Sequence, residues 1–127
     1  MPILFMKQLS VIIAVYNSAP YITQCVERII PQMDSDMELL LLDDGSNDSS
    51  GALCTKLACD NPLINVEHFE HCGVSATRQR GLESAQGKYL LYIDADDEVS
   101  STMIGEMLKC AESNDADMVI CDYKELT

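Results

Sequence analysis

The stretch ELLLLDDGSND, residues 38–48, shows where this chain places its sheet and its chemistry. Its leucine run is apolar on both faces, which is typical of a strand buried inside a parallel sheet. Two aspartates and a glycine follow at once, so the strand ends in an acidic turn. In open parallel sheets, ligands bind beyond the carboxyl ends of the strands. The stretch therefore predicts an α/β fold with an acidic loop at its functional edge.

Apolar runs of the same kind recur along the chain and alternate with helical patterns. We expect strands at Ser10–Val15, Glu38–Leu42, Ile64–Phe69, Lys88–Ile93 and Ala116–Tyr123. Helical spacing of apolar residues predicts helices from Ile22 towards Met33, around Leu53 and Leu57, and over Met103–Ala111. A further helix is expected to start at Gly73-Val74-Ser75 and to continue past Leu82 and Ala85 to Gly87. Ser18 and Ser75 are the expected N-caps, and Gly87 the expected C-cap. The order βαβαβαβαβ predicts an open, mostly parallel sheet with helices on both faces.

Size and composition indicate one globular domain over residues 1–127. The chain has 47% hydrophobic and 23% charged residues, and no run approaches the ~20 apolar residues of a spanning helix. The N-terminus carries no basic leader, so the expected location is the cytoplasm, with peripheral attachment at the inner membrane face as the alternative. Six cysteines without a CxxC pair, beside two histidines, favour reduced thiols over a zinc site.

The charge balance excludes several partners. The chain has 8 Lys+Arg against 21 Asp+Glu, a formal net charge of −13. Binding nucleic acid requires a basic face, and docking on anionic lipid requires basic residues near the surface, so neither is expected. An acidic protein that handles phosphates needs a counter-charge, and a divalent cation is the usual one.

Carboxylates follow two of the expected strands directly. Asp43 and Asp44 come after the second strand, and Asp94, Asp96 and Asp97 come after the fourth. We expect these five groups to converge on one edge of the sheet, where like charges repel. Mg²⁺ or Mn²⁺ with oxygen ligands is the natural counter-ion. The alternative is that these residues only form turns and cap helices.

Other phosphate-binding devices are missing from the sequence. Neither GxGxxG nor GxxxxGK[ST] is present, so phosphate would be held by a metal, a helix N-terminus or a single arginine. Arg78, in the first turn or so of the third helix, is the candidate, and a solvated helix charge is the alternative. Tyr16 ends the first strand and is either a stacking surface for a base or a half-buried core residue. His68 and His71 are expected to be polar surface residues.

Four segments together resemble the family 2 glycosyltransferases, which have the GT-A fold. They are LSVIIAVYNSAPYI (9–22), ELLLLDDGSNDSS (38–50), HCGVSATRQRGLESAQGKYLLYIDADDE (71–98) and DADMVICDY (115–123). The resemblance implies a Rossmann-like nucleotide-diphospho-sugar transferase fold. It also implies that residues 1–127 form the donor-binding half of one such domain. The acceptor half and the catalytic base of the family come after the last residue of this sequence, so no catalytic residue is assigned.

The resemblance assigns the nucleotide base to the ends of the first two strands. Tyr16 and the backbone at Val15 would flank the base. Asp44 would accept a hydrogen bond from it, typically from uracil, and Asp43 would support the loop.

The resemblance assigns the diphosphate and the sugar to the third helix and the fourth strand. Arg78 would lie near the diphosphate or order the loop around it. Asp94 would contact the ribose or the sugar, Asp96 would ligate the Mn²⁺ or Mg²⁺ ion, and Asp97 would lie close by.

The implied activity is transfer of a sugar, with inversion, from a nucleotide-diphosphate donor such as a UDP-sugar to an acceptor hydroxyl. Cell-surface polysaccharide synthesis is the implied setting, and the acceptor, saccharide or lipid-linked, stays open. The alternative is a catalytically incomplete fragment that binds the nucleotide sugar and the metal. Self-association through the surface left by the missing half is also expected. A phospho-receiver domain is rejected because its acidic pair would follow the first strand.

Overall fold

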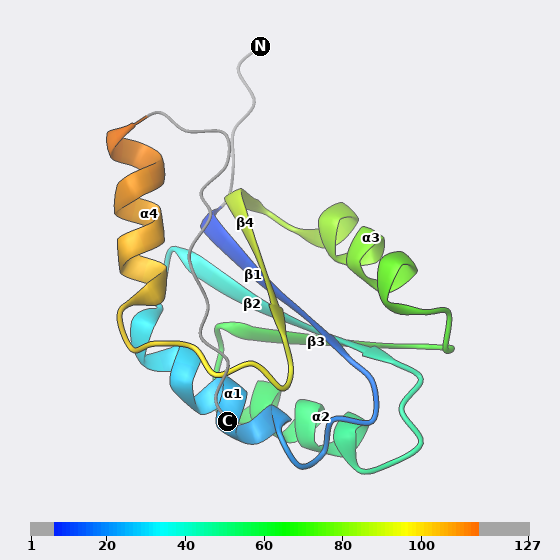
Figure 1. Cartoon of the computed structure of the whole chain (residues 1–127). Coiled ribbons are helices and arrows are strands. Elements are labelled where there is room, and N and C mark those ends of the chain that lie inside the picture. Colours follow the sequence, from blue (N-terminus) through cyan, green and yellow to red (C-terminus); the bar gives the residue numbers. More distant parts are fainter. Residues whose placement is uncertain (1–6, 115–127) are drawn as a thin grey trace.

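The computed structural model describes residues 7–114, and these form one parallel sheet with helices on both faces (Figure 1). The elements are β1 (Lys7–Val15), α1 (Ile22–Ile29), the 3-10 helix η1 (Ile30–Gln32), β2 (Met37–Asp44), α2 (Ser50–Asp60), β3 (Ile64–Phe69), α3 (Val74–Ser84), β4 (Gly87–Asp94) and α4 (Met103–Ser113). The expected α/β architecture is confirmed. The strand expected at Ala116–Tyr123 lies outside the described residues.

The strands lie in the order β3-β2-β1-β4, and each neighbouring pair is parallel. Near the end of β1, Val15 lies opposite Asp43 of β2, and Ala14 lies opposite Asp94 of β4. Three strands therefore end side by side at one edge. This register brings the residue that follows β1 and the acidic ends of β2 and β4 to the same edge of the sheet.

The first core fills the space between the sheet and α1, α2 and α4. Side chains of β1 and β2 on this face pack with Ile22 and Ile29 of α1, Cys54 of α2 and Ile104 of α4, all of them buried. Burying one such large aliphatic side chain stabilises a fold by about 1.5–3 kcal/mol. Every residue of β2 is buried, as its leucine run predicts.

The second core lies on the other face, under α3. Ile12, Leu40 and Leu42 pack there, with Phe69 and Ala85 at the margin. A Cβ at Gly81 of α3 would lie 2.7 Å from Ile12 Cγ2 and 2.8 Å from Leu42 Cδ1. The helix can therefore approach the sheet this closely only because residue 81 has no side chain.

The N-terminal ends of two helices differ from the predictions. Ser18 is not a side-chain cap: its hydroxyl donates to the Tyr16 carbonyl, and its own carbonyl accepts from the amides of Tyr21 and Ile22 at the start of α1. Ser75 lies inside α3, and Gly73 precedes the helix with φ of 96°. A glycine adopts this left-handed conformation without strain. The N-cap position is therefore Gly73, two residues before the expected Ser75.

The C-terminal end of α3 also differs, because Gly87 is not its cap. The helix ends at Ser84, and Gly87 is the first residue of β4. A Cβ at Gly87 would lie 2.5 Å from the Ser10 amide nitrogen. The Gly87 amide donates to Ser10 Oγ at 2.9 Å, and Ser10 Oγ donates in turn to the buried Glu38 carboxylate. Close strand contact, not helix capping, accounts for this glycine.

None of the described helices is both long and apolar enough to cross a membrane.

Candidate functional site

A pocket of about 140 Å³ opens at the carboxyl end of β1 and β2. Its lining comes from three segments that are far apart in the sequence: Ala14, Val15, Tyr16, Asp44, His71 and Val74. Most of this lining is apolar. Its polar side-chain groups are the Asp44 carboxylate, the His71 imidazole and the Tyr16 hydroxyl. The pocket therefore offers flat apolar walls and a few polar groups, which is the usual composition of a small-molecule site.

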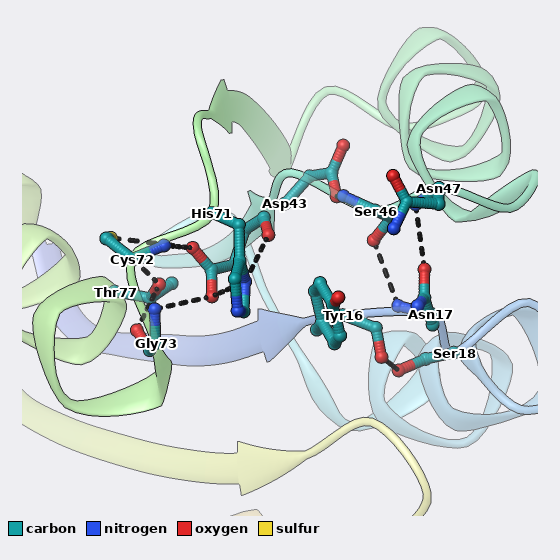
Figure 2. A network of polar contacts seen from close by, with 11 residues as sticks. Tyr16, Asn17, Ser18, Asp43, Ser46, Asn47, His71, Cys72, Gly73 and Thr77 are labelled. Carbon is teal, nitrogen blue, oxygen red and sulfur yellow. Dashed lines mark hydrogen bonds and ion pairs between the residues drawn. The ribbon is translucent and has the colours of Figure 1, made fainter.

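The Asp44 carboxylate is buried and is surrounded by hydrogen-bond donors of the β3–α3 loop. The Cys72 amide donates to Oδ1 at 2.8 Å, and the Gly73 amide donates to Oδ2 at 3.0 Å (Figure 2). The Cys72 thiol lies 3.5 Å from Oδ1, and His71 Nδ1 lies 3.0 Å from Oδ2. Burial alone would raise the pKa of Asp44, but these hydrogen bonds outweigh burial and hold the pKa below its ordinary value. Asp44 is therefore ionised at neutral pH.

The loop wrapped around Asp44 requires a glycine at position 45. Gly45 has φ of 67°, and a Cβ there would lie 2.6 Å from the His71 amide nitrogen. Both the backbone conformation and the close approach exclude a side chain. The end of β2 and the start of the β3–α3 loop are thus packed backbone to backbone.

Tyr16 and His71 stack against each other at the mouth of the pocket. Their ring centroids are 4.3 Å apart, with 30° between the planes, and Tyr16 is 42% exposed. Figure 2 shows the two rings side by side. Of the two interpretations of Tyr16, the structure supports an exposed aromatic surface and not a core residue.

Asp43 is also buried, but it is directed to a different partner. Its Oδ1 accepts the Ser46 amide at 3.0 Å, and its Oδ2 lies 2.8 Å from His68 Nδ1. His68 Nε2 lies 3.0 Å from Thr55 Oγ1 of α2. Asp43 therefore holds the turn after β2 and connects it with β3 and α2.

The loops after β1 and β2 are joined by reciprocal hydrogen bonds. The Asn17 amide donates to Ser46 Oγ at 3.0 Å, and the Asn47 amide donates to Asn17 Oδ1 at 2.8 Å (Figure 2). Asn17 has φ of 48°, a left-handed conformation that asparagine tolerates better than most residues. The Ser18 amide donates to Ser50 Oγ at 2.7 Å. These contacts fix the position of Tyr16 relative to Asp44.

The second group of carboxylates lies after β4 and is exposed. Asp94, Asp96 and Asp97 can each offer one oxygen such that all three atoms lie within 4.8 Å of one another. The Asp94 amide donates to Asp97 Oδ2 at 3.1 Å, which orders the turn. Three carboxylate oxygens at this spacing fit the needs of Mg²⁺ or Mn²⁺, which favour oxygen ligands.

Arg78 connects α3 with this cluster. Its Nη2 lies 2.8 Å from Asp94 Oδ1, and both side chains are partly exposed. The cluster also acts on a buried thiol of α1. Burial raises the pKa of the Cys25 thiol to about 11, and the nearby carboxylates of Asp97 and Asp96 contribute to the increase. One arginine thus compensates only part of the cluster.

The five carboxylates lie at one edge of the sheet, as predicted, but they form two separate groups. Asp94, Asp96 and Asp97 form the exposed cluster, whereas Asp43 and Asp44 are buried, accept hydrogen bonds from backbone amides and each lie beside a histidine. The two histidines are exposed, as expected, but each also pairs with one of these aspartates. Sequence reasoning missed this role because it depends on β3 lying beside β2. The available signal was the position of the two histidines relative to the strand that follows the Asp43-Asp44 pair. His68 lies near the end of that strand, and His71 comes just after it.

Comparisons with known proteins agree with this arrangement. Residues 10–125 match the family model described as glycosyl transferase family 2. Glycosyltransferase GlyG of Streptococcus pneumoniae is 35% identical over 116 residues, which cover 91% of this chain and 38% of GlyG.

Two solved structures share the fold. S. aureus TarS 1-349, in complex with UDP-GlcNAc, superposes with a TM-score of 0.76 at 26% identity. The match covers 87% of this chain and 32% of the TarS chain. The mannosyltransferase PcManGT from Pyrobaculum calidifontis, in complex with GDP-Man and Mn²⁺, superposes with a TM-score of 0.76 at 22% identity. The match covers 84% of this chain and 33% of the PcManGT chain.

The chain spans about a third of the length of these relatives. Within that third, the match runs from β1 past α4 and includes both the pocket and the acidic cluster. The parallel sheet, the site at its carboxyl edge and the match to the family model lead to one conclusion: this chain belongs to glycosyl transferase family 2, with the GT-A fold.

Proposed function

We propose that residues 1–127 form the donor-binding half of one glycosyltransferase domain. It would act in the cytoplasm and transfer a sugar from a UDP-sugar to an acceptor hydroxyl with inversion, in cell-surface polysaccharide synthesis. One observation carries the proposal: an apolar pocket and a group of three carboxylates lie at the same edge of the sheet, connected through the β1–β4 register of Ala14 and Asp94.

The pocket is the proposed site of the nucleotide base, with Val15, Tyr16 and Asp44 around it and Asp43 supporting the loop. An apolar cavity of about 150 Å³ binds a benzene ring. The 140 Å³ found here therefore suits a single six-membered ring such as uracil. The complex of TarS with UDP-GlcNAc supports the choice of a uridine donor.

The acidic cluster is the proposed metal site, with Asp96 as the principal ligand and Asp94 and Asp97 beside it. When bound there, Mn²⁺ or Mg²⁺ would offset the charge that develops on the departing nucleoside diphosphate. Among the protein's own groups, Asp94 would reach the ribose or the sugar. Arg78 would remain paired with Asp94 while its other N–H groups bind phosphate oxygens. The complex of PcManGT with GDP-Man and Mn²⁺ supports the choice of ion.

Inversion requires a carboxylate base that takes the proton from the acceptor hydroxyl. We assign no such base among residues 7–114. The alternative function is therefore binding of the nucleotide sugar and the metal without transfer. The observation that favours it is that both the pocket and the acidic cluster lie within residues 7–114.

Self-association is proposed through the face of β4 that α3 leaves uncovered. Leu90 and Tyr92 lie opposite Ser10 and Ile12, so they point to the same face as α3, and both are exposed. Size-exclusion chromatography with light scattering over a range of concentrations tests this. A monomer at the highest concentration would contradict it.

The test of the function is calorimetric titration of UDP with and without Mn²⁺. We expect binding that depends on Mn²⁺ and is lost in Asp96→Asn. Asp60→Asn, which removes an exposed carboxylate at the end of α2, is the matched control and should bind as the native chain does. Absence of UDP binding to the folded native chain would refute the proposal. Transfer to acceptor hydroxyls by a chain that binds UDP would exclude the alternative.

A further inference from the structure

The β4–α4 connector, residues 95–102, carries two of the three carboxylates of the acidic cluster and lies beside α1 (Figure 1). The Cys25 thiol of α1 donates to the Asp94 carbonyl at 3.8 Å, just before the connector begins. About one turn farther along α1, Arg28 Nη2 lies 3.6 Å from Glu98 Oε1. The helix therefore contacts the chain on either side of the two cluster carboxylates that the connector carries.

Gln32 of η1 makes a third contact with this part of the chain, and its whole side-chain amide takes part. Nε2 donates to the Ser100 carbonyl at 2.8 Å and to the Arg28 carbonyl at 3.0 Å. Oε1 accepts the Ile104 amide at 2.9 Å. A glutamine amide has two N–H donors and one acceptor oxygen, so each of these groups has a partner here. Gln32 thus joins the end of α1 to the last part of the connector and to the first turn of α4.

The Ile104 amide is a donor that α4 cannot satisfy by itself. Ile104 is the second residue of the helix, and the first four amides of a helix have no acceptor within it. The N-cap residue Thr102 makes no side-chain cap hydrogen bond. Gln32, 72 positions earlier in the chain, supplies an acceptor in the way that a local cap normally does. The point at which the connector ends and α4 begins therefore depends on Gln32.

The acidic cluster needs support from outside its own turn. Its three residues are exposed, and like charges repel when their oxygens lie within 4.8 Å of one another. Local hydrogen bonds join only Asp94 and Asp97: each amide donates to the other residue, to Asp97 Oδ2 at 3.1 Å and to the Asp94 carbonyl at 3.0 Å. A connector that is also held at its far end keeps the carboxylates together before an ion binds, which lowers the cost of binding.

We propose that Gln32 is a positioning residue of the metal site, which holds the connector through Ser100 and Ile104 so that Asp96 is presented to the ion. The side-chain amide is fully used in these contacts, so Gln32 acts through the connector and not as a ligand. The base pocket is lined by other segments, at the ends of β1 and β2 and after β3. Loss of Gln32 should therefore weaken the metal-dependent part of UDP binding and leave the metal-free part unchanged. This inference rests on the proposed donor site.

The experiment measures the dissociation constant of UDP by calorimetry without and with Mn²⁺, and the readout is the ratio of the two values. Gln32→Met keeps the length of the side chain and removes its polar groups. We expect this ratio to fall about tenfold in the variant, since losing a group that supports metal ligands typically costs 10–100-fold in metal affinity. Gln24→Met, which makes the same change at an exposed position of α1, is the matched control and should keep the native ratio.

Hydrogen exchange of the metal-free chain tests the same contact without any nucleotide. The Ile104 amide should be protected in the native chain, because Gln32 is its acceptor. In Gln32→Met it should exchange about tenfold faster, the effect of losing about one hydrogen bond, while the amides of β2 stay unchanged. An Ile104 amide that exchanges freely in the native chain would overturn the inference, and this measurement needs no variant.

The outcomes separate this inference from the function on which it rests. If UDP binds the native chain no better with Mn²⁺ than without it, the proposed metal site is wrong and the role of Gln32 is wrong with it. If Mn²⁺ strengthens UDP binding to the native chain and to Gln32→Met by the same factor, the metal site stands and only this inference is overturned. Equal losses of UDP affinity with and without Mn²⁺ also leave the ratio unchanged, so a merely structural role of Gln32 gives the same negative result.

Discussion

Arg78 of α3 and Asp94 at the end of β4 form an ion pair with Nη2 and Oδ1 2.8 Å apart. This pair connects the helix that borders the proposed base pocket with the acidic cluster proposed to hold the metal. It is also partly exposed, so its contribution to folding is expected to be small, about 0–1 kcal/mol. Its importance should therefore appear in ligand binding and not in stability.

Replacing Arg78 tests this separation. Arg78→Gln should weaken UDP binding in the presence of Mn²⁺ by about tenfold or more, since charged hydrogen bonds contribute about 1.5–3 kcal/mol. The free energy of unfolding should change by less than about 1 kcal/mol. Calorimetry and urea denaturation measure the two quantities. Lys88→Gln, at the opposite end of β4, removes the same charge and should leave UDP affinity unchanged. Equal losses of affinity in both variants would show a general charge effect.

Two helical glycines should respond to alanine in opposite directions. At Gly81 a methyl group would meet Ile12 and Leu42 at under 3 Å, so Gly81→Ala should destabilise the fold by about 1–3 kcal/mol. At Gly105 of α4 a methyl group would meet nothing within 4 Å. Gly105→Ala should stabilise by about 0.5–1 kcal/mol through helix propensity. Urea denaturation of both variants provides the measurement. Stabilisation by Gly81→Ala would mean that α3 lies farther from the sheet.

The lowered pKa of Asp44 predicts a stability that is lost in acid. The carboxyl has an ordinary value of 3.8, and its folded-state pKa lies below this. A depressed pKa stabilises the fold above the unfolded-state value, and this stabilisation is lost as pH falls below 3.8 through the folded-state pKa. Urea denaturation across this acid range should therefore show a steeper loss of stability in the native chain than in Asp44→Asn. Parallel curves for the two chains would contradict the assignment.

Asp96→Asn should have opposite effects on the apo protein and on its response to metal. The three carboxylates of the cluster repel one another, because their oxygens lie within 4.8 Å. Removing one charge should raise the melting temperature without metal. Mn²⁺ at about 100 times its dissociation constant should stabilise the native chain by about 2.7 kcal/mol, and this shift should be absent in the variant. Thermal unfolding with and without Mn²⁺ measures both effects. A variant that is less stable without metal would show that Asp96 has a structural role.

Local pattern predicted the strands well and the helix ends poorly. The expected strand Ile64–Phe69 agrees with β3 to the residue. The predicted caps of α3, Ser75 and Gly87, were both wrong. Gly73 enters the helix in a left-handed conformation, and Gly87 is needed for close approach to β1. Neither reason is visible in the local sequence, which offered Ser75 as a plausible cap.

The sequence by itself determined the α/β class and the acidic strand ends, because hydrophobic period and strand order along the chain carry that information. The roles expected for Tyr16, Asp44 and Asp96 are implied by the resemblance to the family. Only the tertiary structure decided the order β3-β2-β1-β4, and with it the partners of each aspartate. Asp43 and Asp44 are neighbours in sequence, yet one pairs with His68 and the other with His71. Successive side chains of a strand point to opposite faces, so adjacent identical residues meet different surroundings. That alternation, together with the packing of β3 beside β2, explains why Asp43 supports the loop whereas Asp44 lines the pocket.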